Sequence, residues 1–210
     1  MPLRVLLADD HAIVREAVAL FLAEAGFEVV GQASDGMEVV RLARDLQPDV
    51  AVLDVVMPLL NGLEAGREIQ QASPGTRTIL LTSRHEDELL LEALRAGMRG
   101  CVLKTYQAQE LIRAIRDVAG GGVYLSPAVS RSVVDAYRSR APLPPDPLSA
   151  RERQVLQLIA EGKRTREIAE LLGVSVKTAE SHRTNIMRKL QITQTAGLVR
   201  YALQRGISQL

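Results

Sequence analysis

The fold of this chain is decided by two stretches, Leu3-Arg-Val-Leu-Leu-Ala-Asp-Asp10 and Asp49-Val-Ala-Val-Leu-Asp54. Each is a short apolar run that ends in carboxylates, without strict alternation of apolar and polar residues. Such runs are typical of parallel strands that are covered on both faces. Three further runs of this kind lie at Glu28–Ala33, Thr78–Leu81 and Cys101–Leu103. The sequence therefore predicts five buried strands.

Helical patterns separate these runs. One apolar stripe at helical spacing is formed by Val14, Ala17, Val18, Phe21, Leu22 and Ala25. A second stripe consists of Leu111, Ile112, Ile115, Val118 and Ala119, and Gly120-Gly-Gly122 ends that helix. Strands that alternate with helices favour an α/β fold. We expect a doubly wound (βα)5 domain with five parallel strands in the order 2-1-3-4-5.

The second part of the chain has a different character. The stretch Ala141-Pro-Leu-Pro-Pro-Asp-Pro147 holds neither a helix nor a strand, and helically spaced apolar residues at 129–137 predict a short helix before it. Beyond it only helical patterns occur, at about 149–161, 165–172, 176–190 and 194–205. We therefore expect a first domain at 1–122, a linker at 123–147 that is partly helical and then Pro-rich, and a small all-α domain of four helices at 148–210.

The net charge of +1 conceals two parts of opposite sign. Residues 1–120 hold 12 Lys/Arg and 18 Asp/Glu, a balance of −6, and residues 121–210 hold 14 and 7, a balance of +7. An acidic part joined to a basic part is typical of a sensor joined to a nucleic-acid binder. Because opposite charges attract, we expect the acidic part to cover the basic part in the resting protein.

The composition also indicates where the protein works. No apolar stretch is long enough to span a bilayer, so we expect no membrane partner. Asp9 and Asp10 interrupt the apolar start of the chain where a signal peptide needs a continuing run. The one cysteine, Cys101, cannot form an internal disulfide, which fits a reducing compartment. We expect a cytoplasmic protein.

Polar side chains follow or end four of the predicted strands. Asp9 and Asp10 follow the first strand, Asp54 the third, Thr82 the fourth and Lys104 the fifth. The carboxyl ends of adjacent parallel strands share a crevice, where the sites of doubly wound folds form. Clustered carboxylates need a cation, and oxygen ligands of this charge suit Mg²⁺. With the hydroxyl and the ammonium, the group forms a site for a phosphoryl group on one carboxylate.

Five motifs carry a resemblance to a known family: Asp9-Asp10, Asp54-Val-Val-Met-Pro58, Gly62, Thr82-Ser83 and Lys104. Through them, residues 1–120 resemble a CheY-like receiver domain. The resemblance implies that Asp54 accepts a phosphoryl group from a sensor histidine kinase. Mg²⁺ would be held by Asp10, Asp54 and the Val56 backbone carbonyl, with Asp9 acting through water. Lys104 would pair with the phosphoryl oxygens, and Thr82 would move to hydrogen-bond them.

Two residues depart from the receiver pattern. Thr105 follows the lysine where the family usually has proline, which leaves the geometry of the Lys104–Thr105 peptide open. Cys101 lies three residues before the lysine, where an aromatic residue often serves as a rotating switch; we interpret it as a buried small hydrophobic residue. The closest alternative is therefore a DNA-binding protein whose receiver works unphosphorylated.

Two other functions are disfavoured by the residues around the acidic site. A haloacid-type phosphatase needs a second aspartate two residues after the nucleophile, and this chain has Val56 there. A flavin carrier needs a phosphate loop rich in glycine and hydroxyl groups after the first strand, and none follows it. We expect a regulator that is not an enzyme, apart from phosphoryl transfer to, and dephosphorylation of, its own aspartate.

The basic part contains a helix-turn-helix joint at Leu171-Leu-Gly-Val-Ser175. Gly173 provides the left-handed residue after one helix, and Ser175 is the N-cap of the next. On that next helix, 176–190, one face is polar and basic, with Lys177, Glu180, Ser181, Thr184 and Arg188. The opposite side carries Ala179, Ile186 and Leu190. This is the layout of a helix that enters the major groove of DNA.

Residues 148–210 resemble the C-terminal domain of the LuxR/NarL/FixJ type. The resemblance rests on Leu148-Ser-Ala-Arg-Glu-Arg-Gln-Val-Leu156, Glu167-Ile-Ala169, Thr178-Ala-Glu-Ser-His-Arg-Thr-Asn-Ile186 and Lys189-Leu190. It implies that 176–190 enters the major groove and that the last helix contributes to dimerisation.

The candidate DNA contacts divide by chemistry. Glu180, Ser181 and Thr184 are candidates for base edges. Phosphate contacts are assigned to Lys177, Arg183, Arg188 and Lys189, and Thr178 and His182 complete the set. We expect Glu152 to form an internal ion pair.

Together these features predict a two-component response regulator of the NarL/FixJ family. Its expected partners are a sensor histidine kinase, double-stranded DNA and a second copy of the chain when phosphorylated. RNA polymerase is a further candidate partner.

Overall fold

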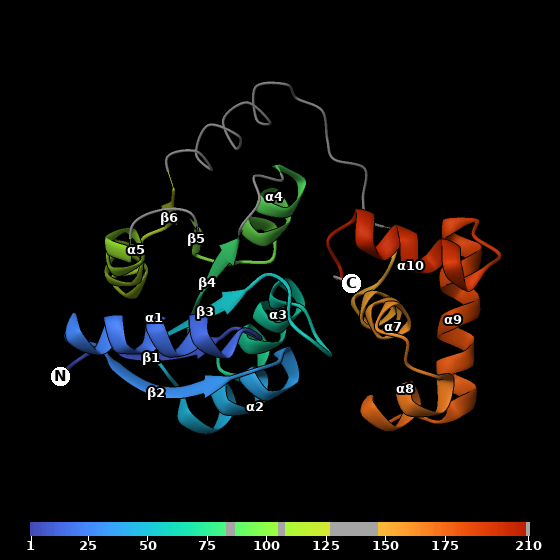
Figure 1. Ribbon diagram of the computed structural model, residues 1–210, viewed down its shortest axis with the longest axis horizontal. Helices are drawn as coiled ribbons and strands as arrows, with labels where there is room; N and C mark the ends of the chain where they lie inside the picture. Colours follow the sequence, from blue (N-terminus) through green and yellow to red (C-terminus); the bar gives the residue numbers. More distant parts are fainter. Residues whose placement is uncertain (83–86, 105–107, 127–146, 209–210) are drawn as a thin grey trace. The chain divides into compact units, whose positions relative to one another are not determined.

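The computed structural model describes residues 1–82, 87–104, 108–126 and 147–208 (Figure 1). The chain forms two compact units, each of which is described by itself. The short helix predicted around 129–137 and the Pro-rich stretch up to residue 146 lie outside the described residues. Within the described residues, no helix combines the length and the apolar character that crossing a membrane requires.

The first unit alternates strands and helices around one parallel sheet. Its elements are β1 Arg4–Ala8, α1 Ala12–Glu24, β2 Glu28–Ala33, α2 Gly36–Leu46, β3 Val50–Asp54, α3 Gly62–Ala72, β4 Arg77–Thr82, α4 Asp87–Arg95, β5 Gly100–Leu103, α5 Ala108–Ala119 and β6 Tyr124–Leu125. The order β2-β1-β3-β4-β5-β6 confirms the predicted doubly wound class and the predicted order of the first five strands.

The prediction of five strands was one short, because the sheet has a sixth. β6 pairs in parallel with β5, with Tyr124 opposite Gly100 and Leu125 opposite Cys101. The strand is two residues long, so it carries no periodicity that a sequence pattern could reveal. It lies in the stretch that the sequence assigns to the linker, and the first unit therefore extends beyond residue 122.

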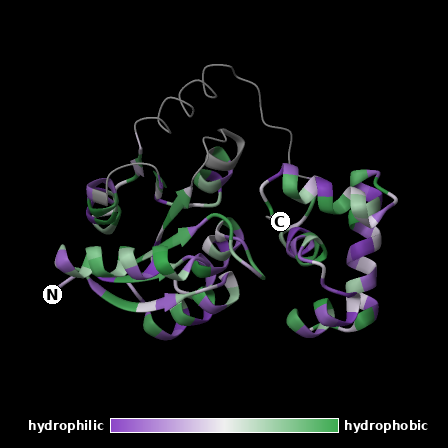
Figure 2. Cartoon of the chain, viewed as in Figure 1, coloured by the Kyte–Doolittle hydropathy of each residue, from purple (hydrophilic) through white to green (hydrophobic). Residues whose placement is uncertain are grey.

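The strands are apolar because helices cover both faces of the sheet (Figures 1 and 2). On one face, Val52 and Ile79 pack with Leu22 of α1 and Ile115 of α5 in one buried cluster. The opposite face meets α2 and α3. This two-sided burial explains why the strand sequences are continuous apolar runs and not alternating ones.

The described residues of the second unit form four helices, α7 Ala150–Ala160, α8 Thr165–Leu171, α9 Val176–Leu190 and α10 Thr195–Gln204. The predicted four-helix organisation is confirmed, with boundaries that agree within one residue. The helices share a core that includes Leu156, Leu158, Ile186, Leu198 and Ala202, all fully buried. Ser149 begins α7 with a reciprocal capping box: its side chain accepts from the Glu152 backbone N–H, and the Glu152 side chain accepts from the Ser149 N–H.

Candidate functional site

The carboxylates predicted at the strand ends lie next to one another. β1 and β3 pair in parallel with Ala8 opposite Leu53, which brings the next residues, Asp9 and Asp54, to the same level of the sheet. Asp9 is 4% exposed and Asp54 is 7% exposed. Two carboxylates this close and this buried repel each other unless a positive charge lies between them.

Lys104 supplies one such charge. Its Nζ lies 2.8 Å from Asp9 Oδ2 and 2.8 Å from Asp54 Oδ2. Its backbone N–H donates to the Thr82 carbonyl at 2.8 Å, which fixes the base of the side chain at the end of β5. Burial lowers the pKa of the Lys104 ammonium, but hydrogen bonds to Asp54 and Asp9 outweigh burial and raise it overall. The lysine is therefore held in its charged form.

The charge at this site is nevertheless not balanced. Burial raises the pKa of the Asp54 carboxyl, the hydrogen bond from Lys104 lowers it, and the charges of Asp9 and Asp10 raise it again. The net direction is upward, because burial outweighs the hydrogen bond and the charge of Lys104, and the charges of Asp9 and Asp10 add to it. The site thus favours an additional positive charge near Asp54.

The donor atoms around Asp54 fit a divalent cation. Asp9, Asp10, His11 and Asp54 each offer one ligand atom, and these atoms all lie within 4.8 Å of one another. Three carboxylates in a partly open position fit Mg²⁺, which combines one or two carboxylates with waters and phosphoryl oxygens. The raised pKa of Asp54 has the sign that a cation would correct. The residues present therefore fit the cation that the sequence predicts.

His11 is the member of this group that the sequence analysis did not single out. Its Nδ1 lies 2.7 Å from Asp10 Oδ1 and 3.5 Å from Asp9 Oδ1. The search for acids at strand ends did not include it, because it lies in the loop after β1. Its position directly after the Asp9-Asp10 pair was the available signal.

Of the two remaining predicted site residues, one lies at the end of the neighbouring strand β4 and the other in the loop after β3. Thr82 is the buried last residue of β4, and β4 pairs with β3 so that Leu81 lies opposite Asp54. Val56 lies in the loop after β3 and is half-buried. The Lys104–Thr105 peptide lies outside the described residues, so its geometry stays a prediction.

Gly62 holds the loop that follows β3 against the end of that strand. Its N–H donates to the Val55 carbonyl at 2.8 Å, and a Cβ on Gly62 would lie 1.9 Å from the backbone carbonyl oxygen of Asp54. No other residue type can occupy this position without a shift of the backbone that carries Asp54. The glycine of the predicted motif is thus explained by close packing.

Cys101 is fully buried in β5, which confirms its interpretation as a buried small residue. Burial raises the pKa of its thiol to about 12. The reactive form of cysteine is the thiolate, so this side chain is chemically inert at neutral pH.

In the second unit, the helix-turn-helix joint has the predicted geometry. Gly173 has φ +62°, and the Val174 N–H donates to the Ala169 carbonyl at 3.0 Å. The Ser175 hydroxyl accepts from the Thr178 N–H at 3.1 Å and so caps α9. Gly173, in the left-handed conformation, follows the end of α8, and Ser175 is the N-cap at which α9 begins.

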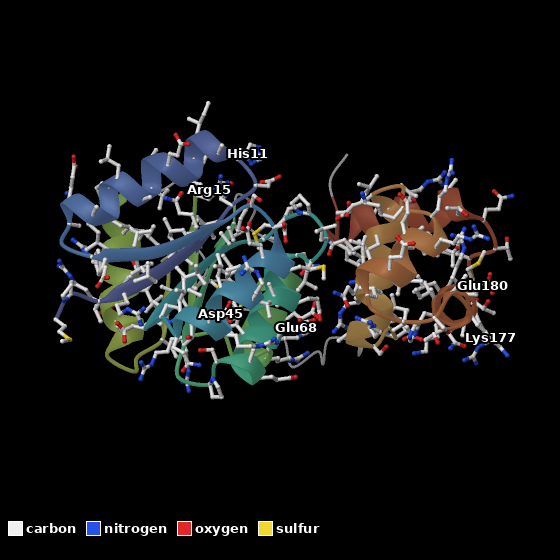
Figure 3. The ribbon with its side chains drawn as sticks, turned by 90° about the horizontal axis from the view of Figure 1, so that it is seen from below. His11, Arg15, Asp45, Glu68, Lys177 and Glu180 are labelled. Carbon is white, nitrogen blue, oxygen red and sulfur yellow. The ribbon has the colours of Figure 1, made fainter. Side chains whose placement is uncertain are left out.

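The outer face of α9 carries most of the predicted DNA contacts. Lys177 and Glu180 lie on its first turns and point outward (Figure 3). Ala179 and Ile186 are buried against the core. The exposed candidates are Lys177, Thr178, Glu180, Ser181, Thr184, Arg188 and Lys189, and the half-buried ones are His182 and Arg183.

Two of the basic candidates also have partners inside the unit. Lys189 Nζ lies 2.6 Å from Glu152 Oε2, which gives Glu152 the internal ion pair that was expected of it. Arg183 donates to the Thr195 hydroxyl at the start of α10. These two side chains connect α9 to α7 and α10, whereas no comparable partner is recorded for Lys177 among the described residues.

Family models match both parts of the chain. Residues 5–116 match the response regulator receiver domain, and residues 146–202 match the bacterial regulatory proteins of the luxR family. The oxygen regulatory protein NreC of Staphylococcus carnosus is 39% identical over 98% of this chain and 99% of its own length. The transcriptional regulatory protein LiaR of Bacillus subtilis is 40% identical over 95% of this chain and 96% of its own length.

Solved structures of response regulators are also similar. A LuxR-family regulator from Aurantimonas is 32% identical with a TM-score of 0.63, over 66% of this chain and 99% of its own. RcsB in a complex with DNA is 28% identical with a TM-score of 0.60, over 96% of this chain and 98% of its own. The chain belongs to the NarL/FixJ family of two-component response regulators, in which a receiver domain is joined to a LuxR-type helix-turn-helix DNA-binding domain.

Proposed function

We propose that Asp54 is the phosphoryl acceptor and that its phosphorylation controls DNA binding by α9. The observation that carries the acceptor assignment is the position of Lys104, whose Nζ lies 2.8 Å from both Asp9 Oδ2 and Asp54 Oδ2. An ammonium at this point can pair with the negative charge of the Asp54 carboxylate, and after phosphorylation with that of a phosphoryl oxygen attached to it. Asp9 and Asp10 lie beside it, where a cation is needed before a dianionic group can approach.

The roles of the individual residues follow from this arrangement. A carboxylate oxygen of Asp54 forms a bond to phosphorus while the bond from phosphorus to the donor histidine of a sensor kinase breaks. Asp10, Asp54 and the Val56 carbonyl would hold Mg²⁺, with Asp9 acting through water, and the bound ion would neutralise charge on the phosphoryl oxygens. Lys104 pairs with one phosphoryl oxygen, and the Thr82 hydroxyl bonds another, which reports occupancy to the loop that follows β4.

The output is binding of α9 in the major groove of double-stranded DNA. Glu180, Ser181 and Thr184 contact base edges, and Lys177 and Arg188 contact phosphates. Lys189 and Arg183 act mainly in holding the helix, because they already have partners at Glu152 and Thr195. The phosphorylated protein acts as a homodimer on two half-sites, and RNA polymerase is the partner of the promoter-bound form.

The domain boundaries are part of the proposal. The sequence assigns residues 1–122 to the receiver, 123–147 to the linker and 148–210 to the DNA-binding domain, and we propose one change to these boundaries. β6 lies at the start of that linker and pairs with β5, which supports assigning Tyr124 and Leu125 to the receiver.

The acceptor assignment is tested with beryllofluoride, which mimics a phosphoryl group on aspartate. Wild type, Asp54→Asn and the control Asp45→Asn are compared with Mg²⁺ present; Asp45 is an exposed carboxylate on α2 of the same unit. We expect beryllofluoride to convert wild type and Asp45→Asn to dimers that bind DNA roughly 5- to 150-fold more tightly, by light scattering and fluorescence anisotropy. Asp54→Asn should not respond. If no protein responds and all bind DNA equally, the receiver works unphosphorylated.

The roles on α9 are tested with Lys177→Ala and Glu180→Ala. We expect Lys177→Ala to weaken binding to all DNA sequences and to reduce the salt dependence of log K by about one unit. Glu180→Ala should instead change which bases are preferred, by about 1–3 kcal/mol at one position. Equal loss on all sequences for Glu180→Ala would contradict its role at a base edge.

A further inference from the structure

The imidazole of His11 lies beside the acidic site. It occupies the N-cap position of α1 with φ −85° and ψ 103°, but its side chain makes no capping hydrogen bond. Its backbone N–H donates to Asp9 Oδ1 at 2.9 Å, and its Nδ1 lies 2.7 Å from Asp10 Oδ1. The imidazole thus lies beside Asp9 and Asp10, two of the three carboxylates of the proposed cation site.

We propose that His11 provides a nitrogen ligand to the cation at Asp9, Asp10 and Asp54, so that this receiver binds first-row transition ions such as Mn²⁺ and Co²⁺ more tightly than Mg²⁺. The inference rests on the metal centre of the proposed function and names its ion class. Carboxylates alone suit Mg²⁺, whereas imidazole is a preferred ligand of transition ions.

The distances agree with shared coordination. Neighbouring ligands in an octahedral site with bonds of about 2.1 Å are about 3 Å apart. The separations of His11 Nδ1 from Asp10 Oδ1 and Asp9 Oδ1, 2.7 and 3.5 Å, lie on either side of that value. One ligand atom of Asp54 lies within 4.8 Å of the same set. A single ion can therefore contact the ring and the carboxylates with small side-chain movements.

His11 and Lys104 do not compete for the same atoms. Lys104 Nζ contacts Asp9 through Oδ2, whereas the His11 ring and backbone N–H face Oδ1. The ammonium and the imidazole thus contact different oxygen atoms of the Asp9 carboxylate. A nitrogen ligand can enter the site while the lysine stays beside Asp54.

The loop that carries His11 is held in place, while its ring remains accessible. Arg15, one turn further along α1, donates from Nη1 to the Asp9 carbonyl at 2.6 Å (Figure 3). The His11 side chain is 65% exposed, so the ring can turn toward an ion without breaking core packing. A fixed backbone with a solvent-exposed ring is suited to binding an ion from solution.

The test uses the full-length, metal-free protein, from which any purification tag has been removed. His11→Ala is compared with wild type, with His182→Ala in the DNA-binding domain and with Asp10→Asn. Dissociation constants for Mg²⁺, Mn²⁺ and Co²⁺ are measured by calorimetry. Nitrogen coupling to bound Mn²⁺ is measured by pulsed electron paramagnetic resonance. His11→Ala removes no capping bond, so the fold is expected to be retained.

We expect His11→Ala to weaken Co²⁺ binding roughly 10- to 100-fold and to remove the nitrogen coupling, while Mg²⁺ affinity changes less than about threefold. His182→Ala should bind the three ions as tightly as wild type and keep the nitrogen coupling. Mn²⁺ that binds wild type without nitrogen coupling, or an equal loss for all three ions in His11→Ala, would overturn the His11 assignment and leave the metal centre standing. If wild type binds none of the ions, or if Asp10→Asn binds them as wild type does, the metal centre itself is wrong and the His11 assignment is overturned with it.

Discussion

Two buried carboxylates of this protein, each paired with a lysine, have pKa values that are shifted in opposite directions. Asp54 in the receiver is 7% exposed and lies 2.8 Å from Lys104, and Glu152 in the DNA-binding domain is 4% exposed and lies 2.6 Å from Lys189. The pKa of Asp54 is raised, whereas that of Glu152 is lowered. A lysine partner therefore does not by itself decide the direction in which the pKa of a buried carboxylate is shifted.

The difference lies in how far the other interactions offset burial, which is the largest cause of the pKa shift for both groups. Burial raises the pKa of both groups, but Glu152 has a lysine and two hydrogen bonds with Ser149 and no second carboxylate among the causes of its shift. Asp54 has the charges of Asp9 and Asp10 beside it. The interactions of Glu152 outweigh its burial, whereas those of Asp54 do not, and a perturbed pKa of this kind is typical of candidate functional sites.

The largest expected effect comes from disturbing the backbone beneath Asp54. In Gly62→Ala the new Cβ would lie 1.9 Å from the Asp54 carbonyl oxygen, so the backbone at the end of β3 and in the loop after it must shift. We expect a loss of stability of about 1–3 kcal/mol and roughly 10- to 100-fold slower labelling by acetyl phosphate.

The matched control for Gly62→Ala is Gly75→Ala, because a Cβ at Gly75 meets no atom within 4 Å. Its unfolding free energy should stay within about 0.5 kcal/mol of wild type. Normal labelling of Gly62→Ala would show that the position of Asp54 tolerates this shift.

A smaller effect is expected at Glu152, whose negative charge is compensated by Lys189 and by hydrogen bonds with Ser149. Glu152→Gln removes the ion pair with Lys189 and should cost about 1–3 kcal/mol of domain stability at pH 7, measured by urea unfolding. Because the pKa of Glu152 is lowered in the fold, this contribution is present above the ordinary value of 4.5 and is lost as pH falls through the folded value. The difference between wild type and Glu152→Gln should therefore shrink below about pH 4.5. Glu170→Gln, on the exposed side of α8, should unfold as wild type does at every pH.

The smallest effect, of opposite sign, is expected at Asp54 itself. Because its pKa is raised, ionisation costs stability as pH rises above the ordinary value of 3.8 through the folded value. Asp54→Asn should therefore have a higher melting temperature than wild type at pH 7 in the presence of a chelator, with a difference that disappears in acid. Asp45→Asn should show no such gain. A lower melting temperature for Asp54→Asn would remove the contrast with Glu152.

The fold was largely predictable because burial on both faces leaves a strong sequence pattern. Continuous apolar strands and helical stripes predicted the fold class and the four helices of the second unit, whereas the order of the five strands was taken from a common doubly wound arrangement. β6 was missed because a two-residue strand has no period, and only its pairing with Gly100 and Cys101 defines it. Sequence patterns indicate local structure, whereas β6 forms only because its backbone pairs with that of β5.

The candidate site was predictable to the extent that parallel strands end at one edge. This rule places Asp9, Asp54 and Lys104 together without any knowledge of side-chain contacts. The same rule passes over His11, which lies in a loop. Helical periodicity also could not show that Lys189, one of the basic residues of α9, is paired with Glu152 on another helix.

The burial of Cys101 has a practical consequence for spectroscopy of this protein. The sequence contains one cysteine, and its thiol is fully buried with a pKa raised to about 12. Maleimide and nitroxide reagents attack thiolates at accessible positions, so the natural chain should remain unlabelled at neutral pH. A cysteine introduced at the exposed Asp45 would then be the single reactive thiol. Fluorescent and spin labels can therefore be placed without first removing Cys101 from the sheet.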